Sequence, residues 1–386
     1  MQASSHLDVV RRIAVDIAGP AADAVDRQAR FPSEAIDALK KAHMMSALVA
    51  PEFGGFGCGM IELAAMCEVL GQECASAAMV FAMHQIQVAC IVRHGISQTF
   101  FREYVGELVE RQRVIASVTS EVGVGGEMRT SLCAVEKSAD RFTLVKDAST
   151  ISYGEHADDL LVTARRGTEA PNSDQSLVLV RRADYALEKT GAWDTLGMRG
   201  TCSPPFKMSS SGNVDQILKE PFATIASHTM VPFSHILWAS CWLGIATAAV
   251  MRARAFVRSQ ARAKPGTLPP TALRLAEASS MLQTMRANVH DVASECESLM
   301  QSQAGTDSLS SIGFALKMNN LKVSSSQLVV QIVNHALLIC GIQGYKNDSK
   351  YAVGRHLRDA HSAALMVGND RIYAANASML LVLKDE

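Results

Sequence analysis

Hydrophobic residues recur with two different periods along the chain, and the change of period divides the chain into three blocks. From residue 7 to about residue 115 the apolar positions follow helical spacing, interrupted by a glycine-rich loop at 51–57. Short apolar runs of strand type follow, at 114–119, 142–145, 160–164 and 177–180. Helical spacing then returns and predicts helices at 232–263, 270–302, 308–340 and 350–384. The pattern therefore predicts an α+β fold in which a small sheet separates two helical blocks.

The three blocks correspond to predicted domains, because 386 residues are too many for one compact core. We expect a helical domain over 1–115, a β-domain over 116–222 and a helical domain over 223–386. No apolar run reaches the ~18–20 residues that a membrane span needs. The N-terminal residues also lack the apolar segment of a secretory signal.

Composition and charge narrow the possible functions. The net charge of −1 leaves no basic surface for nucleic acid. The cysteines number nine, are scattered and form no CxxC pair, which indicates reduced, buried thiols in a cytoplasmic protein. The same scatter argues against a zinc site, so we expect no metal.

Short motifs carry more specific information than the periodicity. Residues 50–57 contain PEFGGFG, which is close to the pattern PExxGGxG, residues 194–201 contain TLGMRGT, and residues 340–360 contain a glycine-rich turn followed by RDA. In this order and in these blocks, the motifs resemble the acyl-CoA dehydrogenase family over nearly the whole chain. The resemblance implies an N-terminal α-helical domain, a middle β-barrel or sandwich domain and a C-terminal four-helix bundle.

The same resemblance implies a cofactor and partners. Such enzymes bind FAD between the sheet and the bundle, and they act on an acyl thioester carried by CoA or by an acyl carrier protein. Their electrons pass to a partner, for which an electron-transfer flavoprotein is the candidate. They assemble as homodimers or homotetramers in which one chain touches the adenosine end of its neighbour's FAD.

Two segments of the β-domain match family positions that contact the flavin ring. Val118, Thr119 and Ser120 match the strand that faces the ring, where backbone N–H groups and a hydroxyl can hydrogen-bond it. Ile151 and Ser152 match the segment on its other face. The alternative for the first segment is a half-buried strand whose threonine turns outward.

Further matches concern the ADP part of FAD and the turn before the last helix. Gly341, Gln343 and Gly344 match a glycine turn that approaches the ADP part, although glycines also simply end helices. Arg262 could replace the family's pyrophosphate arginine, or it could be an ordinary surface residue. Asn369 completes the predicted cofactor contacts.

The residue expected to act as catalytic base is missing. Removing the α-proton of a thioester requires a carboxylate within reach, but the family's glutamate position holds Val367. The alternative family position, on the helix at 232–244, holds no carboxylate either. Asp370 and His235 are therefore the candidate catalytic residues. Their alternative roles are a helix N-terminal acid and a buried helix histidine.

Three functions remain open from the sequence. The first is FAD-dependent α,β-dehydrogenation of an acyl thioester, for which Glu121 and Glu127 are weaker candidates as base. The second is a reduced-flavin-dependent monooxygenase of the same fold, which needs no such base. The third is a non-redox acyl-thioester dehydratase or an inactive homologue.

Overall fold

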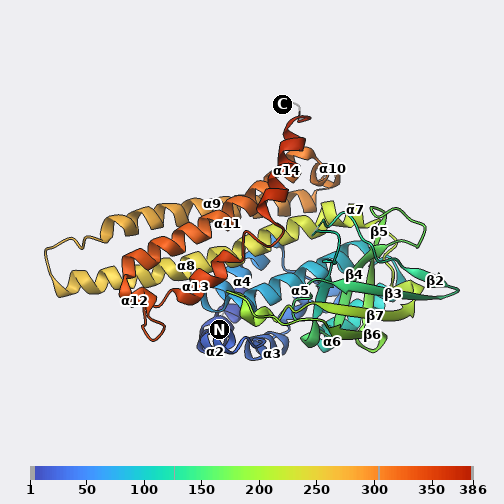
Figure 1. Ribbon diagram of the computed structural model, residues 1–386, viewed down its shortest axis with the longest axis horizontal. Coiled ribbons are helices and arrows are strands. Elements are labelled where there is room, and N and C mark those ends of the chain that lie inside the picture. The colour runs from blue at the N-terminus through green and yellow to red at the C-terminus, as the bar shows by residue number, and fades with distance from the viewer. Residues whose placement is uncertain (1–4, 126, 303–304, 384–386) are drawn as a thin grey trace.

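The computed structural model describes residues 5–125, 127–302 and 305–383, and it confirms the predicted order of helices, sheet and helices (Figure 1). The N-terminal part is helical because apolar residues line the inner faces of its helices. These helices are α1 (His6–Ile13), α2 (Gly19–Gln28), α3 (Ser33–Lys41), α4 (Met60–Glu73), α5 (Ala75–His94) and α6 (Thr99–Arg111). A π-helical turn, η1 (Ala14–Ala18), joins α1 to α2.

Two sheets form the middle of the chain. The first has the order β1-β4-β5, from β1 (Ile115–Val118), β4 (Asp159–Arg165) and β5 (Gln175–Arg181), with β1 parallel to β4. The second has the order β2-β3-β7-β6, from β2 (Glu136–Ser138), β3 (Arg141–Ala148), β6 (Tyr185–Lys189) and β7 (Phe206–Asn213). Strand β3 alternates exposed and buried residues, whereas β4 is buried along nearly its whole length. The second sheet therefore has one solvated face, and β4 is covered on both sides.

The C-terminal part is a bundle of long helices. It consists of α7 (Phe222–Ile225), α8 (Val231–Ala263), α9 (Ala272–Gln301), α10 (Gly305–Leu309), α11 (Ile312–Cys340), α12 (Ile342–Tyr345), α13 (Gly354–His361) and α14 (Asn369–Leu380), with a π-helical turn η8 (Ala226–Met230) before α8. The prediction of a single helix over 350–384 is wrong. The segment forms two helices, α13 and α14, which are separated by turns at 362–368, where Val367 has φ 48°. A β-branched residue rarely adopts this left-handed conformation, so local propensity gives no sign of the break.

Helices α4 and α8 approach each other through two glycines. A β-carbon on Gly244 of α8 would lie 2.8 Å from the main-chain nitrogen of Gln72 and closer still to the main-chain oxygen of Glu68. A β-carbon on Gly71 of α4 would lie 2.6 Å from the main-chain oxygen of Cys241. Only glycine permits this backbone contact, which fixes α8 against the N-terminal helices.

The sheet and the N-terminal helices meet at a buried carboxylate. Asp159, at the start of β4, is fully buried and accepts hydrogen bonds from Arg113 Nε at 2.5 Å and Nη2 at 2.7 Å. It also accepts from the hydroxyl of Tyr104 at 2.7 Å. The charge is therefore paired and hydrogen-bonded, as a buried carboxylate must be. Arg113 and Tyr104 precede the sheet in sequence, so this network joins the two domains.

Among the described residues, three helical stretches are long and apolar enough to cross a membrane by length and composition alone: α5, the continuous helix Phe222–Ala263, and α11. The prediction that no apolar run reaches this length is therefore wrong. In the first two stretches 89% and 83% of the apolar window is buried inside the protein, and in α11 the share is 50%. The apolar surface of α5 and α8 thus packs mainly against other parts of the chain.

Candidate functional site

The TLGMRGT and RDA motifs meet in the structure. The main-chain N–H of Met198 donates to Asp359 Oδ1 at 2.7 Å, and Arg358 pairs with Asp26 of α2. A β-carbon on Gly197 would lie 2.6 Å from the main-chain nitrogen of Asp359 and closer still to the carbonyl of Arg358. Burial raises the pKa of Asp359 to about 6. The two motifs therefore dock the β-domain onto α13 and α2.

Because the backbones are so close here, we expect that even a single added methyl group at Gly197 destabilises the protein. Gly197→Ala should lower the free energy of unfolding by about 1–3 kcal/mol, because the added methyl overlaps the backbone of α13. Gly167→Ala is the matched control in the same domain, since a β-carbon there meets no atom within 4 Å. Denaturant unfolding of both variants measures the difference. Equal stability of the two variants would contradict the docking contact.

The two predicted flavin segments of the β-domain lie side by side. Ser120 Oγ donates to the main-chain oxygen of Thr150 at 2.7 Å, and the Thr150 N–H donates back to Ser120 Oγ at 3.1 Å. Val118 and Ile151 are fully buried and anchor the segments, while Thr119 and Ser152 are partly exposed. The structure therefore brings these five predicted residues together: 118–120 lie at the end of β1, and 151–152 lie just after β3. We call this place the sheet edge.

Ser152 belongs to a row of hydroxyl groups. Thr201 donates to the main-chain oxygen of Met198 at 2.9 Å and lies 2.9 Å from Ser203 Oγ. Ser203 in turn donates to Ser152 Oγ at 2.9 Å. Because Ser152 accepts this bond, its own proton can be donated to a ligand, and no group among the described residues accepts it.

His235 lies in the bundle with two tryptophans on the same face of α8. It is buried, and its Nδ1 lies 3.1 Å from the main-chain oxygen of Met318 on α11. Burial lowers the pKa of His235 to about 4, so the ring is neutral near pH 7. Within the described part of the chain, the buried Nε1 atoms of Trp238 and Trp242 have no hydrogen-bond partner. These unpaired donors are costly unless a ligand or water meets them.

Lys322 of α11 is the central group of this region, and it is not among the residues predicted from the sequence. Its side chain is fully buried, and Nζ donates to the main-chain oxygen of Val367 at 3.0 Å and to Asn369 Oδ1 at 2.7 Å. Nζ also lies 5.9 Å from the ring centre of Trp242. No carboxylate of the described residues forms an ion pair with it. Burial lowers the pKa of Lys322 to about 8, which leaves a substantial neutral fraction near that pH.

The turn before α14 presents backbone and amide groups to Lys322. Val367 contributes its carbonyl, and Asn369 is oriented by a hydrogen bond from its Nδ2 to Ser326 Oγ at 3.0 Å. Asp370, in the first turn of α14, is instead exposed. Neighbouring helical residues point in different directions, so when Asn369 faces the bundle Asp370 faces solvent. The structure therefore does not bring Asp370 to the buried groups around Lys322.

The two weaker carboxylate candidates also lie elsewhere. Glu121 is buried in the β-domain, where it accepts hydrogen bonds from Ser131 Oγ at 2.7 Å and from the Cys133 N–H at 2.6 Å. It pairs with the buried Lys146 at 3.4 Å. Glu127 accepts from a nearby main-chain N–H. Both carboxylates have local structural partners.

The two helical parts of the chain match known domains. Residues 3–112 match "Acyl-CoA dehydrogenase, N-terminal domain", and residues 225–379 match "Acyl-CoA dehydrogenase, C-terminal domain". Together these matches cover more than half of the chain. This chain belongs to the acyl-CoA dehydrogenase family. The family consists of acyl-CoA dehydrogenase-like flavin oxidoreductases, which confirms the enzyme class expected from the motifs.

Individual relatives cover nearly the full length. Cyclohex-1-ene-1-carbonyl-CoA dehydrogenase of Syntrophus aciditrophicus (strain SB) is 24% identical over 373 residues, or 95% of this chain and 86% of that protein. Butyryl-CoA dehydrogenase from Megasphaera elsdenii superposes with a TM-score of 0.82 at 19% identity, covering 97% of each chain. FMN-bound TdsC, a dibenzothiophene monooxygenase from Paenibacillus sp. A11-2, has a TM-score of 0.81 at 20% identity and covers 97% of this chain and 96% of its own. At these identities the two structures show the shared fold.

The residues of this acyl-CoA dehydrogenase family member fit a flavin ring at the sheet edge. Thr119, Ser120 and Ser152 supply hydroxyl groups there, and Ser152 has a free proton. The predicted ADP contacts lie apart from them, because Arg262 ends α8 and Gly341, Gln343 and Gly344 follow α11, at the end of the bundle far from the sheet (Figure 1). Arg262 and Gln343 are exposed there.

Sequence patterns could have revealed Lys322. It lies four residues after Met318 and on the apolar face of α11, where Met318, Leu321 and Val329 are buried. A lysine on such a face is rarely fully buried without a function or a partner. The sequence predicts the helix that carries Lys322, but it does not predict the turn at Val367 that supplies the hydrogen-bond acceptors of Lys322.

Proposed function

We propose that this protein is an FAD-dependent oxidoreductase that removes two hydrogens from an acyl thioester, with Lys322 in place of the usual carboxylate base. The observation that supports this role is the position of its amine beside Val367, where the family has its glutamate. A neutral lysine amine accepts a proton, and its pKa of about 8 provides the neutral form. The carbonyl of Val367, the amide oxygen of Asn369 and the face of Trp242 would stabilise the resulting ammonium.

The cofactor part of the proposal rests on the hydroxyl groups at the sheet edge. Bound FAD would supply the acceptor for the hydride that leaves the β-carbon of the substrate. Thr119, Ser120 and Ser152 would hold the ring, and Ser152 would donate its free proton to it. His235 is a weaker base than Lys322, since the pKa of its ring is about 4. Its Nε2 is better suited to hold a polar group of the substrate.

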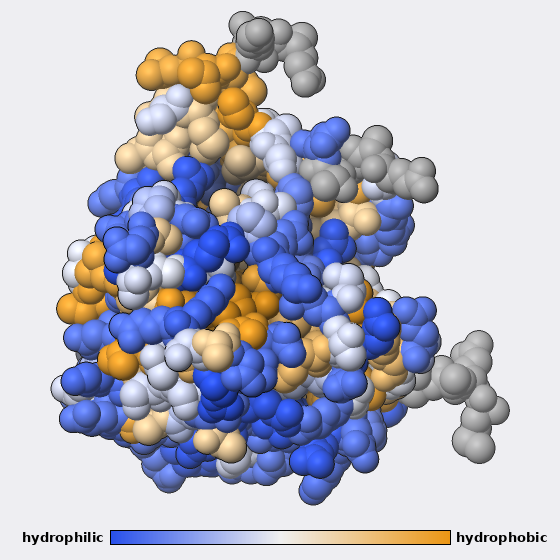
Figure 2. Space-filling view, turned by 90° about the vertical axis from the view of Figure 1, so that its right-hand side faces the viewer, coloured by the Kyte–Doolittle hydropathy of each residue, from blue (hydrophilic) through white to orange (hydrophobic). Residues whose placement is uncertain are grey.

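A homodimer or homotetramer would bring the two parts of the FAD site together. Arg262 and the glycine turn at 341–344 lie far from the sheet edge of their own chain (Figure 1). We therefore assign them to the FAD of a neighbouring copy. The C-terminal segment supports such assembly, because Leu380, Leu381 and Val382 are exposed. Figure 2 shows an apolar patch at the top of the molecule. Electrons would leave through an electron-transfer flavoprotein.

An absorbance experiment tests this function directly. The purified protein, reconstituted with FAD, should show the flavin band in the visible region. Anaerobic addition of acyl-CoA thioesters should bleach that band, and mass analysis of the thioester should show the loss of two hydrogens. A protein that stays colourless after reconstitution, or a flavin that no acyl thioester reduces, would exclude the proposal.

A monooxygenase is the second candidate, and the missing carboxylate favours it. Oxygenation by reduced flavin requires no α-proton base, and the shared fold includes the monooxygenase TdsC. Two tryptophans with unpaired N–H groups, Trp238 and Trp242, could also contact a small aromatic substrate. Oxygen consumption when reduced flavin and an aromatic substrate are supplied, without reduction by acyl-CoA, would select this function instead.

A further inference from the structure

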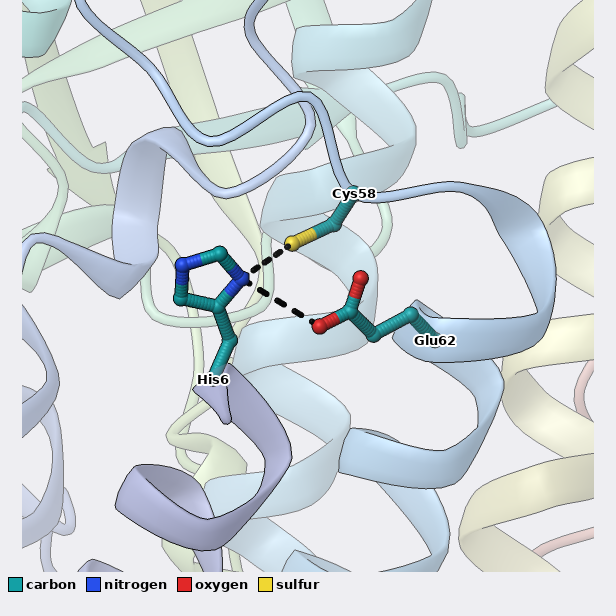
Figure 3. Close-up of side chains that lie close together, drawn as sticks. All are labelled: His6, Cys58 and Glu62. Carbon is teal, nitrogen blue, oxygen red and sulfur yellow. Dashed lines mark hydrogen bonds and ion pairs between the residues drawn. The ribbon is translucent and has the colours of Figure 1, made fainter. Parts of the chain in front are cut away.

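Three side chains with metal-binding atoms converge in the N-terminal domain, away from the Lys322 region. His6 begins α1, Cys58 lies in the loop just before α4, and Glu62 lies in the first turn of α4. Figure 3 shows the three side chains pointing toward one another, with His6 Nδ1 between the other two. Nδ1 lies 3.6 Å from Cys58 Sγ and 3.3 Å from Glu62 Oε1. The three ligand atoms all lie within 4.8 Å of one another.

One ring nitrogen cannot hydrogen-bond both neighbours at once, and without a metal the Cys58 thiol hydrogen-bonds Glu62 instead. A ring nitrogen either carries a proton and donates, or lacks one and accepts. If Nδ1 donates to Glu62, it cannot accept from the Cys58 thiol. If it accepts from the thiol, its lone pair faces the Glu62 carboxylate at 3.3 Å. A metal ion would hold all three side chains directly, because it takes a lone pair from the nitrogen, the sulfur and the oxygen together.

The distances also suit tetrahedral coordination. Zn²⁺ bonds of ~2.3 Å to sulfur and ~2.0 Å to nitrogen or oxygen, at tetrahedral angles, separate sulfur from nitrogen by ~3.6 Å and nitrogen from oxygen by ~3.3 Å. The observed separations are 3.6 Å and 3.3 Å. Two of the three ligand separations therefore already match those around a tetrahedral ion, and the third lies within 4.8 Å.

The three side chains are covered by protein on one side and exposed to solvent on the other. Cys58 is 3% exposed, and the ring of Phe56 stacks on His6 with centroids 4.3 Å apart. The side chains of His6 and Glu62 keep 38% and 36% of their surface exposed. Three protein ligands and a solvent-facing side leave a fourth position for water.

We propose that His6, Cys58 and Glu62 bind a divalent transition-metal ion, with zinc as the best match to this mixed nitrogen, sulfur and oxygen set. Cys58 loses its proton to solvent when the ion binds, so that a thiolate coordinates the metal. The ion ties the start of α1 to the glycine-rich loop at 51–57 and to α4. This site goes beyond the proposed oxidoreductase chemistry and stands independently of it. It also differs from the expectation from the sequence that the chain binds no metal.

Titration of the tag-free full-length protein with Co²⁺ tests the site. We expect one Co²⁺ per chain, with the visible bands of a tetrahedral ion and a near-ultraviolet thiolate-to-cobalt band, and displacement by Zn²⁺. Cys58→Ser and His6→Ala should each weaken Zn²⁺ binding by about 100-fold or more, and Cys58→Ser should abolish the thiolate band. Zn²⁺ should raise the melting temperature of the wild-type protein but not of Cys58→Ser.

A matched control removes a different buried thiol. Cys74 in the same domain is 3% exposed, as Cys58 is, and Cys74→Ser should keep both the cobalt spectrum and the zinc-induced stabilisation. If Cys58→Ser fails to fold, Glu62→Gln keeps the side-chain volume and should weaken binding by about 10-fold while the thiolate band persists. Absence of a thiolate band in the wild type, or an unchanged band in Cys58→Ser, would overturn the proposal.

Discussion

Replacing Lys322 with methionine should lower the rate of anaerobic flavin reduction by acyl-CoA by about 100-fold or more, because a general base typically contributes 10²–10⁴-fold. In the wild type the rate should rise with pH through about 8, as the amine loses its proton, and Lys322→Met should lose this dependence. Stopped-flow absorbance of the flavin measures both quantities. Flavin content is measured separately, so that a loss of cofactor is not mistaken for a loss of the base.

Lys317→Met is the matched control for this variant. Lys317 lies on the same helix, but it pairs with Glu295 and keeps 41% of its side chain exposed. It should therefore leave the rate and the pH profile unchanged. Lys322→Met should remain folded, since the lowered pKa shows that burial disfavours the charge, and methionine fills a similar volume. An unchanged rate and pH profile in Lys322→Met would remove Lys322 as the base.

Gly244→Ala should lower the free energy of unfolding by about 3 kcal/mol, although alanine is the better helix former by ~1 kcal/mol. The added β-carbon would lie 2.8 Å from Gln72 N and closer to Glu68 O, so α8 would have to move away from α4. Guanidinium unfolding followed by circular dichroism measures the change.

The control for Gly244→Ala makes the same substitution in another long helix. Gly313 lies in α11, and a β-carbon there meets no atom within 4 Å. Gly313→Ala should therefore keep or raise the free energy of unfolding, by up to ~1 kcal/mol. Opposite signs for the two variants would establish the close approach of α4 and α8. The same sign in both would contradict it.

The fold could be predicted from the sequence because its motifs encode backbone contacts. Gly197 and Asp359 hold the β-domain against α13, and this contact needs a glycine and a carboxylate at fixed positions. The long helices α8, α9 and α11 follow from periodicity alone, because each buries one apolar stripe. The break before α14 was not predicted, since Val367 adopts a conformation that tertiary contacts impose.

The candidate site was less predictable for a physical reason. Family positions indicated where the segments at Ser120 and Ser152 would lie, and the structure brings them together. The contacts of Lys322 with Val367 and Asn369, by contrast, join residues about 45 positions apart in sequence through an irregular turn. No spacing rule relates such residues. The same holds for His6 and Cys58, which are 52 positions apart.

The Asp159 network has a consequence for dividing this protein into pieces. A cut at the sequence boundary near residue 115 would separate Tyr104 and Arg113 from Asp159. The isolated β-domain would then hold a carboxylate at a buried position without its cation, and removing one partner of a buried pair typically costs 3–5 kcal/mol. We therefore expect that the β-block cut at this boundary does not fold on its own, and recombinant fragments that contain it should begin well before α6 or include the entire chain.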